Sequence, residues 1–412
     1  MAGRPSAGPQ ATPPGAFFGL PGFTQPFEQF ENLTGIQTPL ALASQSPWNP
    51  PGSFQKTDIV KWWELAVDVN WTTTVTGSTL SAEAPYNLLQ ALKLKLQGQY
   101  SPLEVESGFD AAFFQMYRPM RNGDYPNNMG VNVGSTFSNS AIPQTNQQSS
   151  GIAANPASGT HWKFLLEIPG GLYIDQYWDL AIDGTLLPNS NGMIAPMGAF
   201  VSPQYMGGGE RVVVPQFTYS AITAPNADSG PLTGSTAGAA TVTVDARRVG
   251  YYGSANVGEL PPVFNWQYRR ASKRVPLGAV TKADIPVTEY GQLLSTYVRI
   301  FSPTGGYQSV TDSTVTKAQL LYGSNLPRFD DSIEAMQNRF ISQHGFLPPV
   351  GTVVWDMLAN TSSSGGLLSN DARVLNTLTN SNTHVHLEFA SALNSDAYAV
   401  IGTELLVPVA TQ

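Results

Sequence analysis

Alternation of apolar and polar side chains is the strongest pattern in the first half of the chain. In the clearest run, every second residue is a large apolar one: Trp63, Leu65, Val67, Val69 and Trp71. A period of two indicates a β-strand with one face against a core and the other toward solvent. Shorter runs of strand character recur at 92–96, 162–168, 179–182, 211–217 and 241–245.

A second series of short apolar runs fills the last third of the chain. They lie at 296–301, 318–322, 350–355, 384–389 and 405–409. Parallel α/β folds need a helix after nearly every strand, and the sequence lacks such helices. Many short strands separated by turn signals instead favour β-sandwiches.

Two segments have the spacing of short helices. The first follows Ser107, which we expect to cap it, and carries an apolar face of Phe109, Phe113 and Met116 before Pro119 ends it. A second candidate helix covers residues 330–344. Each half of the chain is therefore expected to contain one helix.

The second helix is the more regular of the two. Asp330 or Asp331 is expected to cap it, and Gly345 is expected to end it. Its apolar stripe has helical spacing and consists of Ile333, Met336, Phe340 and Ile341.

Residues 1–52 differ from the rest in being rich in Pro and Gly and studded with aromatic residues. Prolines exclude a long helix, and linkers are seldom aromatic. We therefore predict an extended N-terminal arm that anchors on a neighbouring surface, with a mobile tail as the alternative. The predicted anchors are Phe17, Phe18, Phe23, Phe27 and Phe30.

Two further stretches, 125–160 and 220–240, are predicted to be long neutral loops, since 125–162 holds no charged residue. The predicted division is an arm (1–52), a first sandwich with long loops (53–275) and a second sandwich (276–412).

Charge is scarce in this chain. Asp, Glu, Lys and Arg make up 12% of it, about half the usual share of roughly 25%. A chain with so few charged residues is expected to have much of its surface covered by other protein subunits, and identical subunits are the simplest candidate. The net charge of −8 argues against direct binding of nucleic acid, which depends on Lys and Arg.

The absence of cysteine excludes disulfides and thiolate chemistry. No membrane span or secretory signal is expected.

One basic run stands out: Arg269, Arg270, Lys273 and Arg274. It precedes the second series of strands, which places the domain boundary near 275. Three interpretations remain open. The run contacts anionic lipid heads, pairs with an acidic face of the next subunit, or forms a solvated turn.

Candidate sites for chemistry are few. His384, His386 and Glu388 share one face of a strand and could ligate a metal, but alternation alone explains their spacing. The Gly-rich segment 207–210 lacks the context of a phosphate loop. We expect no cofactor, no metal and no enzymatic activity.

The order of elements resembles a known family. The segments EYGQLLSTYVRIFSPTGGYQ, RFDDSIEAMQNRFISQHGF, VGTVVWDML, THVHLEF and AVIGTELLVPV are similar to the second jelly roll of tectivirus-type major capsid proteins of membrane-containing bacteriophages. YNLLQALKLKLQG and THWKFLLEIPGGLYI resemble that family's first jelly roll. The resemblance covers residues 53–410.

The resemblance implies an all-β fold of two tandem eight-stranded jelly-roll β-sandwiches, each with a short flanking helix and long loops. It implies homotrimers of pseudo-hexagonal outline that tile an icosahedral virion shell over an internal membrane. Implied partners are neighbouring trimers, other capsid proteins such as a vertex penton, and membrane lipids, with assembly in the host cytoplasm. The Pro- and Phe-rich N-terminus departs from the helical segment of that family.

Two other function classes stay open. One is a secreted carbohydrate-binding or carbohydrate-active β-sandwich protein, in which aromatic side chains stack on sugars. The other is a phage receptor-binding protein, which often carries fibrous repeats that this sequence lacks.

Overall fold

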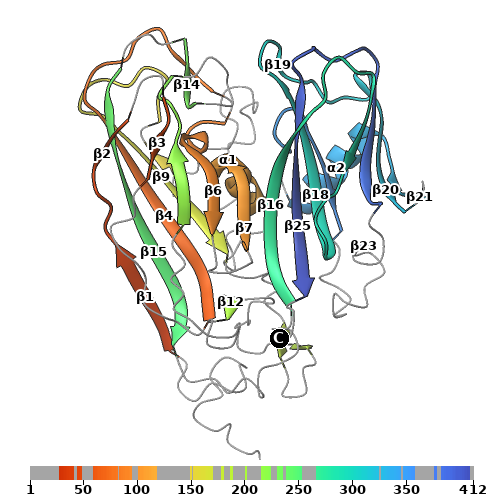
Figure 1. The fold of residues 1–412 in the computed structure, drawn as a ribbon, viewed down its shortest axis with the longest axis horizontal. Helices are drawn as coiled ribbons and strands as arrows, with labels where there is room; N and C mark the ends of the chain where they lie inside the picture. Colours follow the sequence, from red (N-terminus) through yellow and green to blue (C-terminus); the bar gives the residue numbers. More distant parts are fainter. Residues whose placement is uncertain are drawn as a thin grey trace, which may run out of the picture.

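A computed structural model describes most of the chain. The described residues are 27–40, 44–48, 59–81, 83–94, 101–117, 149–150, 152–169, 178–180, 186–188, 200–201, 215–223, 230–234, 238–252, 266–323, 326–344, 347–357, 375–377 and 382–408. They form two β-sandwiches that stand side by side with their long strands nearly upright (Figure 1). We name these sandwiches the first roll and the second roll.

The first roll has eight principal strands. They are β1 (Phe27–Leu33), β3 (Ser46–Pro47), β4 (Ile59–Trp71), β6 (Leu89–Leu94), β7 (Leu103–Ser107), β9 (His161–Pro169), β13 (Pro215–Tyr219) and β15 (Ala240–Tyr252). One sheet has the order β1-β15-β4-β9, and the facing strands have the order β3-β13-β6-β7. Counted along the chain, these orders are first-eighth-third-sixth and second-seventh-fourth-fifth, which is the jelly-roll arrangement.

The second roll repeats this topology. Its principal strands are β16 (Trp266–Pro276), β17 (Lys282–Pro286), β18 (Gln292–Ser302), β20 (Val315–Tyr322), β21 (Leu326–Asp330), β22 (Thr352–Asp356), β24 (His384–Phe389) and β25 (Tyr398–Pro408). The orders are β16-β25-β18-β22 and β17-β24-β20-β21. The predicted double jelly roll is therefore confirmed.

Short elements complete both rolls. The minor strands are β2 (Thr38–Leu40), β5 (Thr79–Leu80), β8 (Ser149–Ser150), β10 (Trp178–Leu180), β11 (Leu186–Pro188), β12 (Phe200–Val201), β14 (Leu232–Thr233), β19 (Gly306–Tyr307) and β23 (Leu375–Asn376), with one 3-10 turn, η2 (Tyr86–Leu88). The helices α1 (Gly108–Tyr117) and α2 (Ile333–His344) each lie between the fifth and sixth principal strands of their roll.

The alternating apolar residues face the cores of the two rolls, as the sequence predicts. Trp63, Leu65, Val67, Val69 and Trp71 are all buried inside the first roll. The core of the second roll is aliphatic and is built around Ile285, Val298, Ile300, Val385 and Leu387.

The first two strands of the first roll lie within the segment predicted to be a separate arm. β1 pairs antiparallel with β15 over its whole length, and β3 pairs with β13. Between β1 and β2 the chain passes so close to β15 that a Cβ on Gly35 would lie 2.1 Å from the Val244 carbonyl oxygen. A separate arm can therefore comprise residues 1–26 at most, and these lie outside the described residues.

The predicted helix caps need correction. Helix α2 is capped by Ser332 and not by Asp330 or Asp331. The Ser332 hydroxyl accepts a hydrogen bond from the Ala335 N–H (3.2 Å), whereas Asp331 forms an ion pair with Arg339. At the first helix, the buried Ser107 hydroxyl has no hydrogen-bond partner among the described residues, so it does not act as a cap. Serine is as good an N-cap residue as aspartate, and Ser332 directly precedes the first turn of α2. Asp331 and Asp330 lie one and two residues too early for that position.

Candidate functional site: the seam between the jelly rolls

The two rolls share one continuous sheet. β7, the last strand of its sheet in the first roll, pairs in parallel with β16 of the second, with Leu103 opposite Arg270 and Glu104 opposite Ala271. This pairing joins β3-β13-β6-β7 to β16-β25-β18 in a ten-stranded sheet. We call the contact between the rolls, formed by β7, α1 and the loop before η2 on one side and by β16, β25 and β18 on the other, the seam.

Helix α1 covers the face of the second roll that points toward the first. The ring centre of Tyr297 in β18 lies 5.0 Å from the ring centre of Phe113 and 5.3 Å from that of Phe114, and both phenylalanines belong to α1. All eleven residues of β18 are buried, because its other face lies on the aliphatic core of its own roll. Helix α1 is mostly apolar and is likewise covered, since residues 108–115 are all buried.

Charged groups are buried at the centre of the seam. The Arg299 guanidinium lies 3.2 Å from a Glu83 carboxylate oxygen and 3.2 Å from an Asp110 oxygen. Tyr297 donates its hydroxyl to Asp110 (2.7 Å) and Tyr307 donates to Glu83 (2.5 Å). Both carboxylates belong to the first roll, whereas the arginine and both tyrosines belong to the second.

The electrostatics of this cluster follow from burial and pairing. Burial by itself would lower the pKa of Arg299, but Glu83 and Asp110 outweigh it and raise that pKa above its ordinary value. Burial, followed by the Glu83 charge, raises the pKa of Tyr307 well above its ordinary value. The cluster therefore holds a charged arginine between carboxylates and a neutral tyrosine at neutral pH.

A second polar network extends the seam along β16 and β25. Glu404 accepts hydrogen bonds from Tyr268 and from Ser295 (2.8 Å), and Arg270 lies 3.5 Å from the same carboxylate. The Arg270 guanidinium also lies 5.3 Å from the centre of the Phe114 ring in α1. The seam therefore combines edge-on and tilted aromatic contacts with buried ion pairs between the two rolls.

The basic run does not form one patch. It lies in strand β16, so the boundary predicted near 275 falls at the end of a strand of the second roll. Arg270 is buried, and Arg269 faces Glu289 (3.2 Å) and Glu104 (3.8 Å). Arg274 lies over the Tyr398 ring (4.1 Å) and is exposed, as is Lys273. The two arginines that start the run thus pair with carboxylates of the same chain.

The predicted aromatic anchors divide between two parts of the chain. Phe27 and Phe30 lie in β1, opposite Tyr252 and Val249 of β15. Phe17, Phe18 and Phe23 lie outside the described residues. The anchoring role of these side chains stays a prediction.

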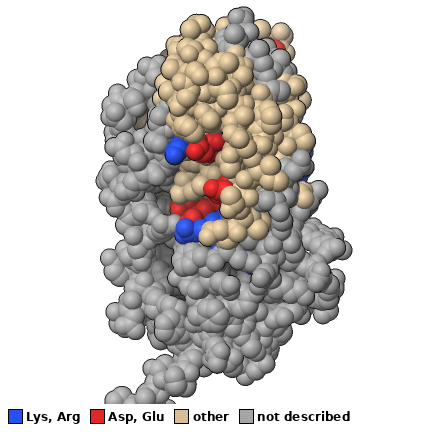
Figure 2. Space-filling model, turned by 90° about the vertical axis from the view of Figure 1, so that its left-hand side faces the viewer, with Lys and Arg blue, Asp and Glu red and all other residues tan. Residues whose placement is uncertain are grey.

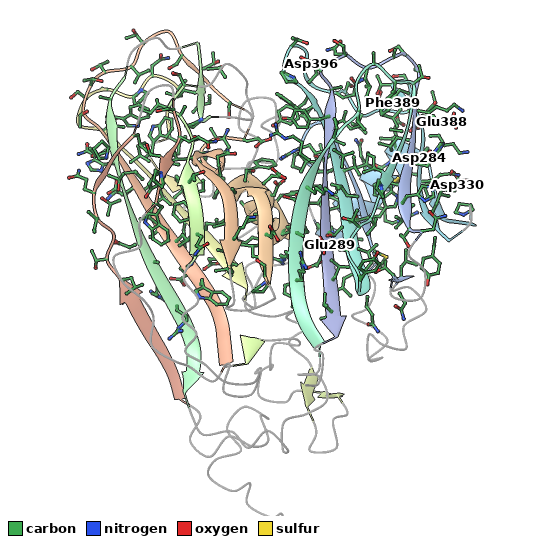
Figure 3. All side chains as sticks on the ribbon, viewed as in Figure 1. Asp284, Glu289, Asp330, Glu388, Phe389 and Asp396 are labelled. Atoms are coloured by element: carbon green, nitrogen blue, oxygen red, sulfur yellow. The ribbon has the colours of Figure 1, made fainter. Side chains whose placement is uncertain are left out.

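The histidine pair lies on the outer face of the second roll. Asp284 and Glu388 are near neighbours there (Figure 3), and His386 contacts both, at 2.6 Å through Nδ1 and 3.1 Å through Nε2. The hydrogen bond from His386, followed by that from Lys282, lowers the pKa of Glu388. Within the part of the chain that the structure describes, no three His, Asp or Glu side chains are placed to hold a metal ion.

Sequence reasoning missed Glu83, Asp110 and Arg299. A signal for two of them exists, because Asp110 interrupts an apolar helix and Arg299 interrupts an apolar strand, and a charge in such a setting needs a buried partner. Their common partnership is spatial and leaves no local pattern.

No helix in the described ranges is both long enough and apolar enough to cross a bilayer. No protein-family model matches the sequence, and no curated protein matches it. Solved structures do match its fold. The major capsid protein of the virus STIV is 14% identical, with a TM-score of 0.52 over 93% of this chain and 97% of that one. The capsid of the virus PBCV-1 is 10% identical, with a TM-score of 0.52 over 93% of this chain and 94% of that one. At such low identity these matches establish the double jelly-roll fold.

Proposed function

We propose that this chain is the major capsid protein of an icosahedral virion and that it works by association with copies of itself. The observation that carries the proposal is the fold match over nearly the whole length of both chains, to proteins that build virus capsids. Each match covers 93% of this chain. Fold alone does not fix function, so the remaining support comes from the surface.

The composition of the surface supports self-association. Only 12% of the residues are charged, and several of these are buried at the seam within the chain. Large exposed apolar side chains are present on the second roll at Tyr290, Ile341, Leu347 and Val350. A surface poor in charge and carrying apolar groups suits repeated protein contacts.

We further propose the finer arrangement that the resemblance implies. The chain forms homotrimers, the trimers tile the shell beside other capsid proteins such as a penton, and an internal membrane lies beneath. Residues 1–26 form an arm anchored by Phe17, Phe18 and Phe23, and Lys273 and Arg274 supply exposed positive charge for a contact. Assembly takes place in the host cytoplasm, and catalysis plays no part.

Sedimentation of the purified chain tests the proposal. The expected result at micromolar concentration and neutral pH is a species of about 132 kDa, which is three times the 44.1 kDa chain. A monomer that persists at all accessible concentrations would contradict it. Removal of residues 1–26 should leave both rolls folded and should weaken assembly between trimers.

A further inference from the structure

Helix α2 covers one edge of strand β22 in the second roll. Among the described strands, β22 pairs only with β18, so its other edge has no strand partner there. Helix α2 packs along β22. The free edge of a strand carries N–H and C=O groups that no ladder satisfies, and a covered edge must satisfy them inside the protein. The groups on this edge therefore need partners beneath the helix.

The register between β18 and β22 identifies the residues whose backbone groups lie on that edge. The Ile300 N–H donates a hydrogen bond to the Gly351 carbonyl oxygen (2.9 Å). Hydrogen-bonded and non-bonded pairs alternate along two antiparallel strands. Thr352 and Val354 therefore belong to the non-bonded pairs, and their backbone N–H and C=O groups point away from β18.

The Thr352 side chain adds a buried polar group at the same place. Its backbone N–H donates to the Pro349 carbonyl oxygen (3.1 Å). Its hydroxyl, however, has no hydrogen-bond partner among the described residues, although the residue is only 1% exposed. A hydroxyl that is buried without a partner carries the full cost of its desolvation, so a partner for this group is expected.

A small cavity lies between α2 and β22. Its volume is about 10 Å³, and Thr352 and Val354 line it from the strand. Apolar side chains of α2 form most of the facing wall, together with Gln337. The Gln337 Nε2 donates to the Val310 carbonyl oxygen (3.0 Å), which leaves the amide oxygen of Gln337 as an acceptor.

The size of the cavity selects its occupant. A single water molecule needs roughly 10–15 Å³ and two to four polar partners. Pockets for organic ligands are far larger, at about 300–1,000 Å³. The Thr352 hydroxyl and the backbone edge of β22 supply the polar partners, so the cavity suits one water molecule and nothing larger.

We propose that one ordered water molecule is bound between α2 and β22, where it hydrogen-bonds to the Thr352 hydroxyl and to the Val354 N–H. This water takes the place of a neighbouring strand, so α2 can cover the edge of β22 without leaving its polar groups unpaired. The site lies inside the second roll and is independent of the self-association proposed above.

Thr352→Val tests the site, because valine keeps the shape of threonine and removes the hydroxyl. If the hydroxyl bonds to a bound water, its removal leaves that water with one partner fewer, and the melting temperature should fall by about 1–3 °C. A dry hydroxyl without a partner gives the opposite sign, since its removal relieves a desolvation penalty. An unchanged or raised melting temperature of T352V would overturn the proposal.

Two control variants isolate the buried site. The sheet β1-β15-β4-β9 of the first roll faces the viewer in Figure 2, and Thr243 is a half-buried residue of its strand β15. Thr243→Val makes the same chemical change beside bulk solvent, so it should leave the melting temperature unchanged.

The second control removes a buried hydroxyl that does not line the cavity. Ser107 is 3% exposed, and its hydroxyl likewise has no partner among the residues that the structure describes. Ser107→Ala should therefore leave the melting temperature unchanged or raise it. A fall in either control equal to that of T352V would show that the loss is not specific to the cavity, and the assignment would be overturned.

A crystal structure or an electron cryo-microscopy map that shows ordered waters gives an independent measurement. The expected result is one peak at about 2.7–3.2 Å from both the Thr352 Oγ1 and the Val354 nitrogen. A cavity without density, or one that takes up xenon as dry apolar cavities do, would overturn the proposal.

Discussion

Arg299→Met tests the ionic centre of the seam. Methionine keeps much of the volume of the side chain but removes its charge, which leaves Glu83 and Asp110 without their shared partner at side-chain exposures of 2% and 0%. Removal of one member of a buried ion pair typically costs about 3–5 kcal/mol, because an uncompensated charge stays behind. Here one substitution removes the cation that two buried carboxylates share, so the loss should lie in at least that range.

The chain offers a matched control. Arg339 forms an ion pair with Asp331 at 2.8 Å, a shorter distance than at the seam, but the two side chains are 43% and 33% exposed. Exposed pairs contribute about 0–1 kcal/mol. The same change, Arg339→Met, should therefore cost at least about 2 kcal/mol less than Arg299→Met.

Equilibrium unfolding in urea measures both variants against wild type. Combining R299M with Glu83→Gln and Asp110→Asn should restore part of the stability at neutral pH. Equal losses in R299M and R339M would refute the account of the seam.

Two further predictions concern the same region. Gly402→Ala would place a Cβ 2.1 Å from the ring of Tyr297, so the overpacked ring should shift and cost about 1–3 kcal/mol, measured as a lower melting temperature; an unchanged melting temperature would show that the ring is not confined. Tyr307 keeps its proton in the folded state above the pH of about 10 at which an unfolded tyrosine loses it. Stability should therefore fall as the pH rises above that value, by up to about 1.4 kcal/mol per pH unit for this group, and Tyr307→Phe should reduce the slope of the urea midpoint against pH; an unchanged slope would exclude Tyr307 as its source.

The sequence predicted strands well where one face is apolar. The alternation around Trp63 and the run 384–389 both became strands, because period two is a local property that burial enforces. β16 was not foreseen as a strand, since four basic residues in a short stretch suggest solvent. In the structure, pairing with β25 and β7 determines its conformation, and Glu404 accounts for the burial of Arg270.

The start of the first roll was missed for a related reason. Prolines and glycines before residue 52 argue against regular structure, yet β1 pairs with β15 more than two hundred residues later. Such long-range pairing is invisible to local patterns, and the same holds for the buried cluster around Arg299. The close approach of the Tyr297 ring to Gly402 is another example, because no local sequence pattern around either residue predicts that the two are neighbours.

Electron cryo-microscopy of the purified oligomer tests the central claim most directly. The proposed self-association predicts closed homotrimers in which the two jelly rolls of each copy stand upright around a common axis. Single unassembled chains, or copies joined into open filaments, would contradict the account.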